Sequence, residues 1–184
     1  VSNSHMIKNS EWGAMAYLAE SKYGRNHSTI TRNDAMVSRA ITTGEGNYTS
    51  NTNQSTTGNV YGIYDTVGGA YEYTAGYVAD SSRNYGNSFA STNNSTNNKT
   101  ESTKFSTVYN STQNDSNTEN YNANINKKFG DGIVETSTSG NGTTSWHSAY
   151  SYFVGNYSGT KYPFISRGGY YRDTSAGIFS FSDY

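Results

Sequence analysis

The chain has 184 residues, enough for one domain, or for one domain with a ragged extension. Its net charge is -1, and charged residues make up 15% of the chain, against about 25% in an average soluble protein. This composition excludes a sizeable basic patch and argues against nucleic acid as a partner, because affinity for phosphates comes from several clustered cations.

The composition also predicts a folded, loop-rich domain with an aromatic core. Hydrophobic residues make up only 32% of the chain, and its 18 Tyr supply a large part of them. A disordered chain would combine few aromatic residues with a high net charge, and neither condition is met here. Each buried aromatic side chain removes roughly 150–250 Å² from water, so about a dozen could compensate for the missing Leu and Ile.

Cysteine is absent, which excludes disulfides, Cys-ligated zinc and a cysteine nucleophile. The sequence contains no apolar run of the roughly 18 residues that a transmembrane helix requires, so we expect no membrane-spanning segment. Because the chain begins with Val1 rather than with an initiator Met, we expect it to be a processed or trimmed piece of a longer chain.

The first predicted element is a helix between Asn9 and Gly24, in the sequence NSEWGAMAYLAESKYG. Asn9 or the Ser that follows it can cap the start, and Gly24 is a typical stop signal. Apolar residues such as Trp12 and Leu18 recur at helical spacing, whereas Glu20 belongs to the polar face. We therefore expect this helix to pack its apolar face on the core.

The middle of the chain, residues 80–126, is dominated by Asn, Ser and Thr. Because it has little apolar surface to bury, it predicts long loops that single aromatic residues anchor. A disordered linker over part of this region is the alternative. Further on, Lys127 to Thr136 predicts one helical turn, and the alternation in Gly177 to Phe181 predicts a strand.

The motifs give little support to catalysis. The three histidines lie outside metal-ligand patterns such as H-E-x-x-H, and the sequence contains neither a G-x-S-x-G elbow nor a phosphate-binding loop. Paired carboxylates for glycoside chemistry remain an open alternative, because spacing in sequence does not report separation in space. The acidic residues in glycine- and asparagine-rich turns suit calcium, with simple solvation as the alternative: Asp65, Glu72, Asp80, Asp131 and Asp173.

Aromatic residues in loops rich in Asn, Ser and Gly form the remaining candidate site. Tyr and Trp offer rigid amphipathic contact area, and the polar residues offer adaptable hydrogen bonds, a combination that recognition loops use. Most of the Tyr must nevertheless belong to the core. The residues that we expect at a ligand-binding surface are Tyr85, Tyr109, Tyr121, Trp146, Tyr150, Tyr152 and Tyr171, with Arg172 and Asp173 after the Arg-Gly-Gly turn.

Three short blocks carry a family resemblance. SEWGA from Ser10, GNVYGIYDTVGGAYEYTAGY from Gly58 and RGGY from Arg167 occur in this order and bracket nearly the whole chain. They resemble the "EAEWE-A", "N-YGLYD-VGN-WEW" and "RGGSW" blocks of the formylglycine-generating-enzyme (sulfatase-modifying factor) family. The resemblance implies a single α+β domain over residues 1–184 with a C-type-lectin-like fold, loop-rich, with few short twisted strands and one or two helices.

The resemblance also implies the structure of the middle block and a metal site. The block would form a strand, a glycine turn at Gly68 and Gly69, and a second strand whose aromatic residues fill the core. The carbonyls of Gly68 and Ala70 and the carboxylate of Glu72 would hold a calcium ion. Family members that oxidise their substrate use cysteines, and since this chain has none, the formylglycine chemistry is excluded.

The blocks are similar to those of a cysteine-poor branch of the family found in Firmicutes and their phages. Some members of this branch follow a pilin-like helix, and variable binding proteins of diversity-generating retroelements share the lectin-like fold. We therefore expect a non-enzymatic, extracellular recognition or adhesion domain on a cell surface or phage particle, with a glycan or protein as ligand. A structural subunit of a pilus-like filament or phage tail is the second hypothesis, and an enzyme with oxygen ligands to a metal is the third.

Overall fold

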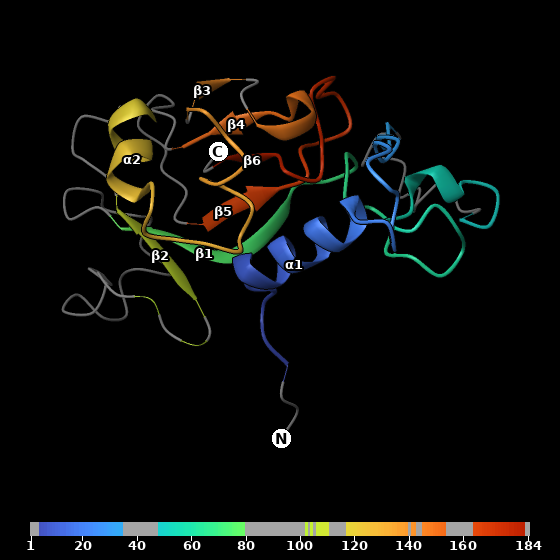
Figure 1. The fold of residues 1–184 in the computed structure, drawn as a ribbon, viewed down its shortest axis with the longest axis horizontal. Coiled ribbons are helices and arrows are strands. Elements are labelled where there is room, and N and C mark those ends of the chain that lie inside the picture. Colours follow the sequence, from blue (N-terminus) through green and yellow to red (C-terminus); the bar gives the residue numbers. More distant parts are fainter. Residues whose placement is uncertain are drawn as a thin grey trace.

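The computed structural model describes residues 4–34, 48–79, 102, 104, 106–110, 117–139, 141–142, 145–153 and 164–182. Its helices and strands form an α+β arrangement, which confirms the predicted class (Figure 1). In chain order the elements are α1 Asn9–Glu20, the 3₁₀ helix η3 Thr52–Gln54, β1 Glu72–Ala79, β2 Thr107–Asn110, α2 Asn117–Asn124, β3 Asn141–Gly142, the 3₁₀ helix η5 Trp146–Ser148, β4 Ser151–Tyr152, β5 Phe164–Arg167 and β6 Phe181–Ser182.

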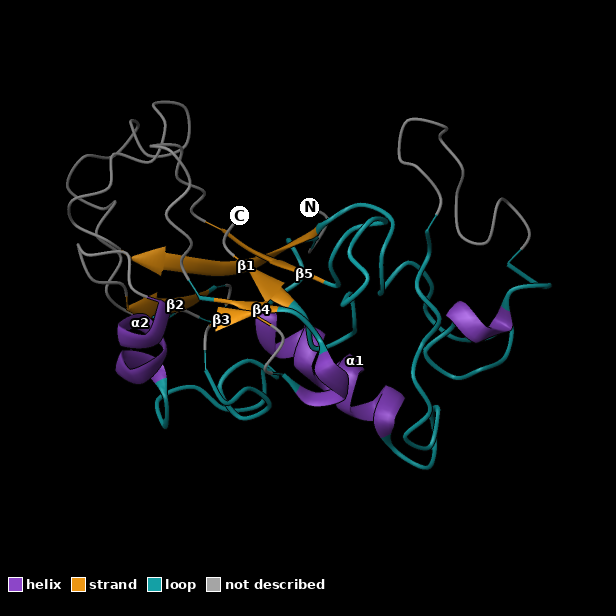
Figure 2. Cartoon of the chain, turned by 90° about the horizontal axis from the view of Figure 1, so that it is seen from above, coloured by secondary structure: helices purple, strands orange, loops and turns teal. Residues whose placement is uncertain are grey.

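The described strands form one mixed sheet in the order β2-β1-β5-β6-β4-β3. β1 pairs antiparallel with β5, so that Glu72 lies opposite Arg167, and it pairs parallel with β2. β6 pairs antiparallel with β5 and parallel with β4, and β3 pairs antiparallel with β4. Figure 2 shows α1 and α2 on the same side of this sheet. The sheet therefore joins the middle of the chain to its last strands.

α1 begins at Asn9 because Lys8 and Glu11 cap it together. The Glu11 carboxylate accepts the backbone N–H of Lys8 at 2.9 Å and pairs with the Lys8 ammonium group at 3.0 Å. These hydrogen bonds from Lys8 lower the pKa of Glu11 to about 2. The cap is thus Lys8 rather than Asn9 or its neighbour, and the helix ends at Glu20 because Ser21 is extended.

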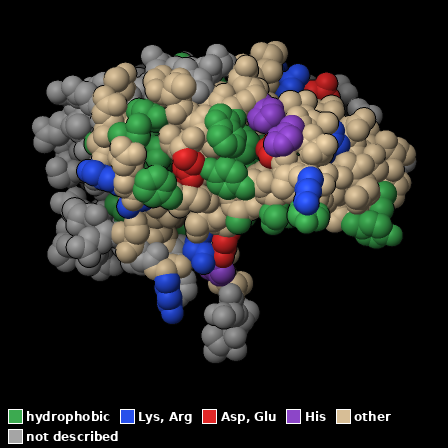
Figure 3. All heavy atoms as spheres, in the orientation of Figure 1, with side chains coloured by type: hydrophobic (Ala, Val, Ile, Leu, Met, Phe, Trp, Pro, Cys, Tyr) green, Lys and Arg blue, Asp and Glu red, His purple; other side chains and the backbone are tan. Residues whose placement is uncertain are grey.

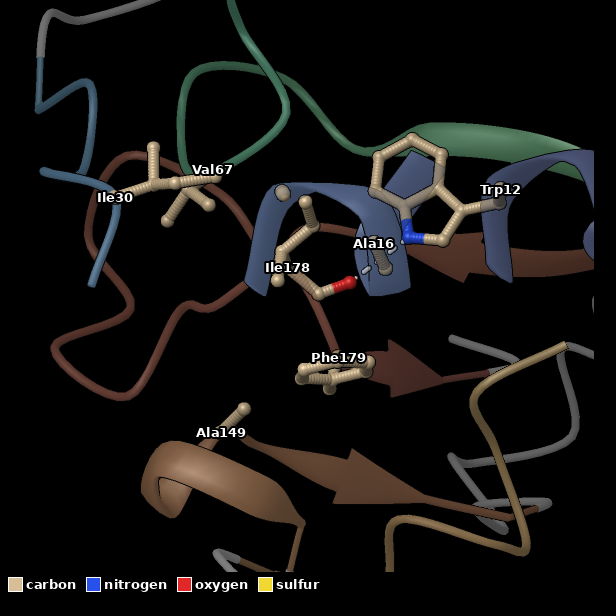
Figure 4. Close-up of a cluster of buried hydrophobic side chains, with 8 residues drawn as sticks. Trp12, Ala16, Ile30, Val67, Ala149, Ile178 and Phe179 are labelled. Atoms are coloured by element: carbon tan, nitrogen blue, oxygen red, sulfur yellow. Dashed lines mark hydrogen bonds between the residues drawn. The ribbon is translucent and has the colours of Figure 1, made fainter. Parts of the chain in front are cut away.

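One hydrophobic cluster joins α1 to the C-terminal part of the chain. Figure 4 shows Trp12 and Ala16 of α1 beside Ile178, and the indole N–H of Trp12 donates to the Ile178 carbonyl at 2.8 Å. Phe179 lies on the far side of Ile178, towards Ala149. The members of the cluster are Trp12, Ala16, Ala19, Ile30, Val67, Ala149, Ile178 and Phe179.

A second cluster joins α2 to the sheet. The rings of Tyr109 and Phe153 meet edge to face at 5.6 Å, and those of Phe153 and Phe181 at 6.1 Å. Such pairs stabilise beyond the area that they bury. Aromatic side chains thus form four of the seven members of this cluster, as the composition predicts, whereas six of the eight members of the first cluster are aliphatic. The members of this cluster are Tyr109, Tyr121, Ile133, Val134, Phe153, Ile165 and Phe181.

The three sequence blocks lie side by side. The Arg167 guanidinium group lies 5.7 Å from the centroid of the Trp12 ring, and it donates to Oδ1 of Asn9, just before the first block, at 3.0 Å. The Gly68 N–H donates to the Gly168 carbonyl at 3.0 Å. Gly168 has a φ of 78°, and a Cβ atom there would lie 2.6 Å from the Thr66 carbonyl oxygen, so this close approach requires glycine.

The middle block does not form the expected pair of strands. Residues 58–71 are turns, bends and a single bridge, and only β1 is a strand. Tyr73 of β1, an aromatic residue of the expected second strand, is 42% exposed instead of filling the core, and Tyr61 and Ile63 before the turn are 91% and 55% exposed. Gly58 and Asp65 have positive φ, and the resulting turns replace the alternation that would direct every second side chain inwards.

Two other predictions were wrong in extent, and a third is confirmed. The described part of residues 80–126 contains β2 and α2 besides loops, and the aromatic residues Tyr109 and Tyr121 of these elements are buried. Asp80 and the rest of that region lie outside the described residues. The helical turn predicted within Lys127 to Thr136 is present at residues 134–136, where the Ser137 N–H donates to the Ile133 carbonyl at 3.2 Å. Within Gly177 to Phe181, residues 178–179 form a turn, and the strand begins at Phe181.

Candidate functional site

Two of the predicted ligand-binding residues, Tyr109 and Tyr121, are core residues, so the prediction is wrong for them. Tyr109 is 0% exposed and Tyr121 5%. The Tyr109 hydroxyl accepts from Nδ2 of Asn9 at 2.8 Å and donates to the Asp131 carboxylate, and burial raises the pKa of Tyr109. The Tyr121 hydroxyl donates to the Ser137 carbonyl at 2.7 Å. Both hydroxyls therefore find their partners inside the core.

Trp146, Tyr150 and Tyr152 lie at or near the surface beside η5 and β4. Trp146 is 49% exposed and meets Phe179 edge to face at 5.5 Å. The rings of Tyr150 and Tyr152 are 4.7 Å apart, and both residues are partly exposed. These three residues can therefore contribute to a contact surface, whereas Tyr85 lies outside the described residues.

Tyr171, Arg172 and Asp173 form the turn that follows the Arg-Gly-Gly block. The Tyr171 N–H donates to the Gly69 carbonyl at 2.9 Å, which places the turn against the middle block. Arg172 is exposed, and its guanidinium group lies 5.3 Å from the centroid of the Tyr171 ring. The Asp173 carboxylate accepts the N–H of Tyr170 at 3.2 Å, and partial burial raises its pKa. The turn thus presents the Arg172 cation to solvent.

A groove that the sequence does not predict lies between the C-terminal half of α1 and residues 56–63. Its volume is about 460 Å³. Four large apolar side chains along it are strongly exposed, at 91% for Tyr61, 79% for Tyr23, 63% for Leu18 and 55% for Ile63. Figure 3 shows hydrophobic side chains along the lower right of one face of the molecule. The groove is lined mainly by Met15, Leu18, Tyr23, Thr57, Tyr61 and Ile63.

Residues 56–63 form a closed loop that fixes one wall of the groove. The Thr56 N–H donates to the Ile63 carbonyl at 3.0 Å, and the Ile63 N–H donates to the Thr56 hydroxyl at 3.0 Å. The Tyr61 N–H donates to Oδ1 of Asn59 at 2.9 Å. A Cβ atom at Gly62 would lie 1.9 Å from the Ser55 hydroxyl oxygen. This tight loop holds Tyr61 and Ile63 outwards.

The resemblance implies a calcium site formed by Gly68, Ala70 and Glu72. These residues extend from the glycine turn to the first residue of β1. Partial burial and the neighbouring Asp65 carboxylate raise the pKa of Glu72. A cation between the two carboxylates would relieve their repulsion. Among the described residues, no three or more acidic or histidine side chains gather for a metal, so carbonyl oxygens would supply the remaining ligands. Carboxylate and carbonyl oxygens are the donors that calcium prefers, so this set fits the ion.

Calcium is therefore expected to raise the midpoint of thermal unfolding. At a calcium concentration of 100 times its Kd, binding to the folded state alone adds about 2.7 kcal/mol. Calorimetry in calcium and in EDTA measures this difference. Glu72→Gln should abolish the calcium response, whereas Glu11→Gln, at an α1 carboxylate that pairs with Lys8, should retain it. A parent chain with the same midpoint in both buffers would contradict the prediction.

Comparisons with known proteins give no relative. No protein-family model, no curated protein and no solved structure matches the chain. In the part of the chain that the structure describes, no helix has both the length and the apolar character to cross a membrane. A proposal about function therefore depends on the surface features described above.

Proposed function

We propose that this chain is a non-enzymatic, extracellular recognition or adhesion domain with a C-type-lectin-like fold. In this proposal the domain is displayed on a cell surface or phage particle, and it binds a glycan or protein in the groove beside α1. The observation that supports this is the concentration of exposed apolar side chains, Leu18, Tyr23, Tyr61 and Ile63, around one groove. Exposed apolar patches of this kind mark interaction sites in soluble proteins.

The size and chemistry of the groove suit a ligand. A volume of about 460 Å³ lies within the range of about 300–1,000 Å³ that ligand sites occupy. Each square ångström of apolar surface that a ligand covers contributes about 25 cal/mol, before the costs of association. The Tyr23 and Tyr61 rings offer flat faces that can stack on a sugar or on an apolar side chain, and Thr57 offers a hydroxyl group.

The strongly perturbed titratable groups lie elsewhere, which favours binding over catalysis. Arg167 is fully buried, and burial lowers its pKa to about 10. Burial raises the pKa values of Asp131 and Tyr109. In an active site, such groups would face a cleft. Here the Tyr109 hydroxyl donates to Asp131, and Arg167 donates to the Asp131 carbonyl at 2.8 Å, so the three groups stabilise the core.

The proposal predicts that changes in the groove abolish binding without unfolding the chain. A glycan array and a peptide-display library, each probed with the purified chain, would provide candidate ligands. Tyr61→Ala should weaken the binding of a groove ligand by at least about tenfold, because exposed Tyr anchors act as hot spots. Phe129→Ala is the matched control, because Phe129 is 70% exposed and does not line the groove.

Ligands that bind the parent and Tyr61→Ala equally well would exclude the groove as the site. A structural subunit of a filament or phage tail is the second candidate, because an exposed apolar groove can also pack on a neighbouring copy. Analytical ultracentrifugation separates the two functions. The structural subunit is favoured if the parent chain forms polymers without ligand and the Tyr61→Ala variant does not.

A further inference from the structure

A small recess lies at the C-terminal end of α1. Its walls come from α1, η5 and the segments at Thr29 and before β6, and its volume is about 40 Å³, enough for a group the size of one or a few water molecules. In Figure 3, histidine side chains lie beside an acidic side chain on the right half of the face. The recess is lined chiefly by Glu20, Thr29, Trp146, His147, Gly177 and Phe179.

Glu20 places a buried carboxylate in this recess, and its Oε2 atom is not satisfied by a hydrogen bond from the described residues. Its side chain is only 8% exposed, and Nε2 of His147 lies 3.1 Å from its Oε2 atom. This contact lacks the geometry of a hydrogen bond, and among the described residues Oε2 has no hydrogen-bond partner. A buried carboxylate is unfavourable unless a donor, best a cationic one, satisfies it. A cation with N–H donors that enters the recess would meet this requirement.

Aromatic rings form the rest of the recess. His147 and Ser148 have φ angles of 59° and 55°, a strained conformation for residues other than glycine. The His147 ring is nearly parallel to that of Phe179, with 6.2 Å between the centroids and 11° between the planes. Trp146, which is 49% exposed, also lines the recess. An indole face is the aromatic surface that attracts cations most strongly.

We propose that this recess binds the primary ammonium group of a lysine side chain on a protein ligand. The Glu20 carboxylate supplies the counter-charge and accepts hydrogen bonds from the ammonium group, while the Trp146 indole packs against the methylene stem. A compact ammonium group suits a recess of about 40 Å³ better than a planar guanidinium group does. This inference rests on the proposed function, because it names the chemistry of one part of the recognised ligand.

Nα-acetyl-lysine methylamide is a suitable probe, and the indole N–H signal of Trp146 in NMR titrations is the readout. The signal should shift saturably with the lysine probe and stay in place with the norleucine analogue, which lacks only the ammonium group. Glu20→Gln keeps the shape of the side chain but removes its charge, and it should weaken binding by at least about tenfold. Glu11→Gln alters an exposed carboxylate of the same helix and should leave the affinity unchanged.

A second variant tests the recess independently. His147→Asn removes the imidazole that contacts the Glu20 carboxylate at 3.1 Å, so the lysine probe should bind several-fold more tightly. Three results would each overturn the proposal. The parent and Glu20→Gln could bind the lysine probe with equal affinity, the parent could bind the norleucine analogue as tightly as the lysine probe, or His147→Asn could lose binding of the lysine probe. Methylamine that binds as tightly as the lysine probe would overturn the assignment to a lysine side chain. Tyr61→Ala should bind the probe normally, so a failure of the groove and a failure of the recess are distinguishable.

Discussion

Replacing Arg167 with Met is expected to lower the free energy of unfolding by about 3–5 kcal/mol, because it removes one member of a buried charge arrangement. The Arg167 guanidinium group donates to Oδ1 of Asn9 at 3.0 Å and to the carbonyls of Asp131 and Gly132 at 2.8 and 3.3 Å. Burial lowers the pKa of Arg167, and the Asp131 charge opposes this effect by favouring the protonated guanidinium group. Met fills much of the volume but donates none of these hydrogen bonds. The Thr74 and Thr136 hydroxyls still donate to Asn9 and Gly132, whereas the Asp131 carbonyl loses the donor that Arg167 supplies.

Urea denaturation measures this loss. Arg172→Met is the matched control, because Arg172 is exposed and its replacement should change the free energy of unfolding by no more than about 0.5 kcal/mol. Arg167→Lys keeps the charge but loses the planar fork of donors, so an intermediate loss is expected. A loss below about 1 kcal/mol for Arg167→Met would show that the buried guanidinium group does not hold α1, β5 and the Asp131 segment together.

Gly13→Ala is expected to destabilise the protein, although Ala is normally preferred to Gly inside a helix by about 1 kcal/mol. Gly13 is buried in α1, and a Cβ atom there would lie 2.0 Å from the Gly130 carbonyl oxygen and 2.6 Å from Cα of Asp131. The chain can relieve this overlap only by moving α1 away from the backbone that places Asp131 against Tyr109. We expect a loss of about 3 kcal/mol, the upper part of the range for overpacked cores.

Ala14→Gly, at the next and exposed position of α1, is the control. It should cost about 1 kcal/mol through helix propensity alone, which measures the gain in propensity that the steric overlap at Gly13 has to exceed. Thermal and urea unfolding of both variants give the comparison. A Gly13→Ala variant that is more stable than the parent would show that residues 130–131 do not pack directly on α1.

The parts of the fold that depend on local pattern or on composition could be predicted. The spacing around Trp12 indicates α1, and the abundance of Tyr and Phe indicates an aromatic core. Burial of individual residues could not be predicted in the same way. Leu18 shares the helical spacing of Trp12, yet it is 63% exposed, whereas Trp12 is 3% exposed. Spacing defines a face of the helix, but the tertiary contacts decide how much of that face is covered.

The candidate sites depend still more on contacts distant in sequence. Tyr61 and Tyr109 are the same residue type, but a tight loop holds the first outwards, and hydrogen bonds to Asn9 and Asp131 hold the second in the core. The concentration of Tyr and Gly from residue 58 onwards was the only sequence signal near the groove. The contact of Glu20 with His147 had no signal, because it joins a helix end to a turn far along the chain.

The hydrogen bond between Trp12 and Ile178 spans 166 residues, and this separation affects how the protein folds. α1 has only 12 residues, a length at which an isolated helix is marginal in water. During synthesis, this helix emerges from the ribosome long before the residues that cover it. The docking of α1 must therefore wait until Ile178 has been translated, and folding should be slow compared with that of domains built from local contacts.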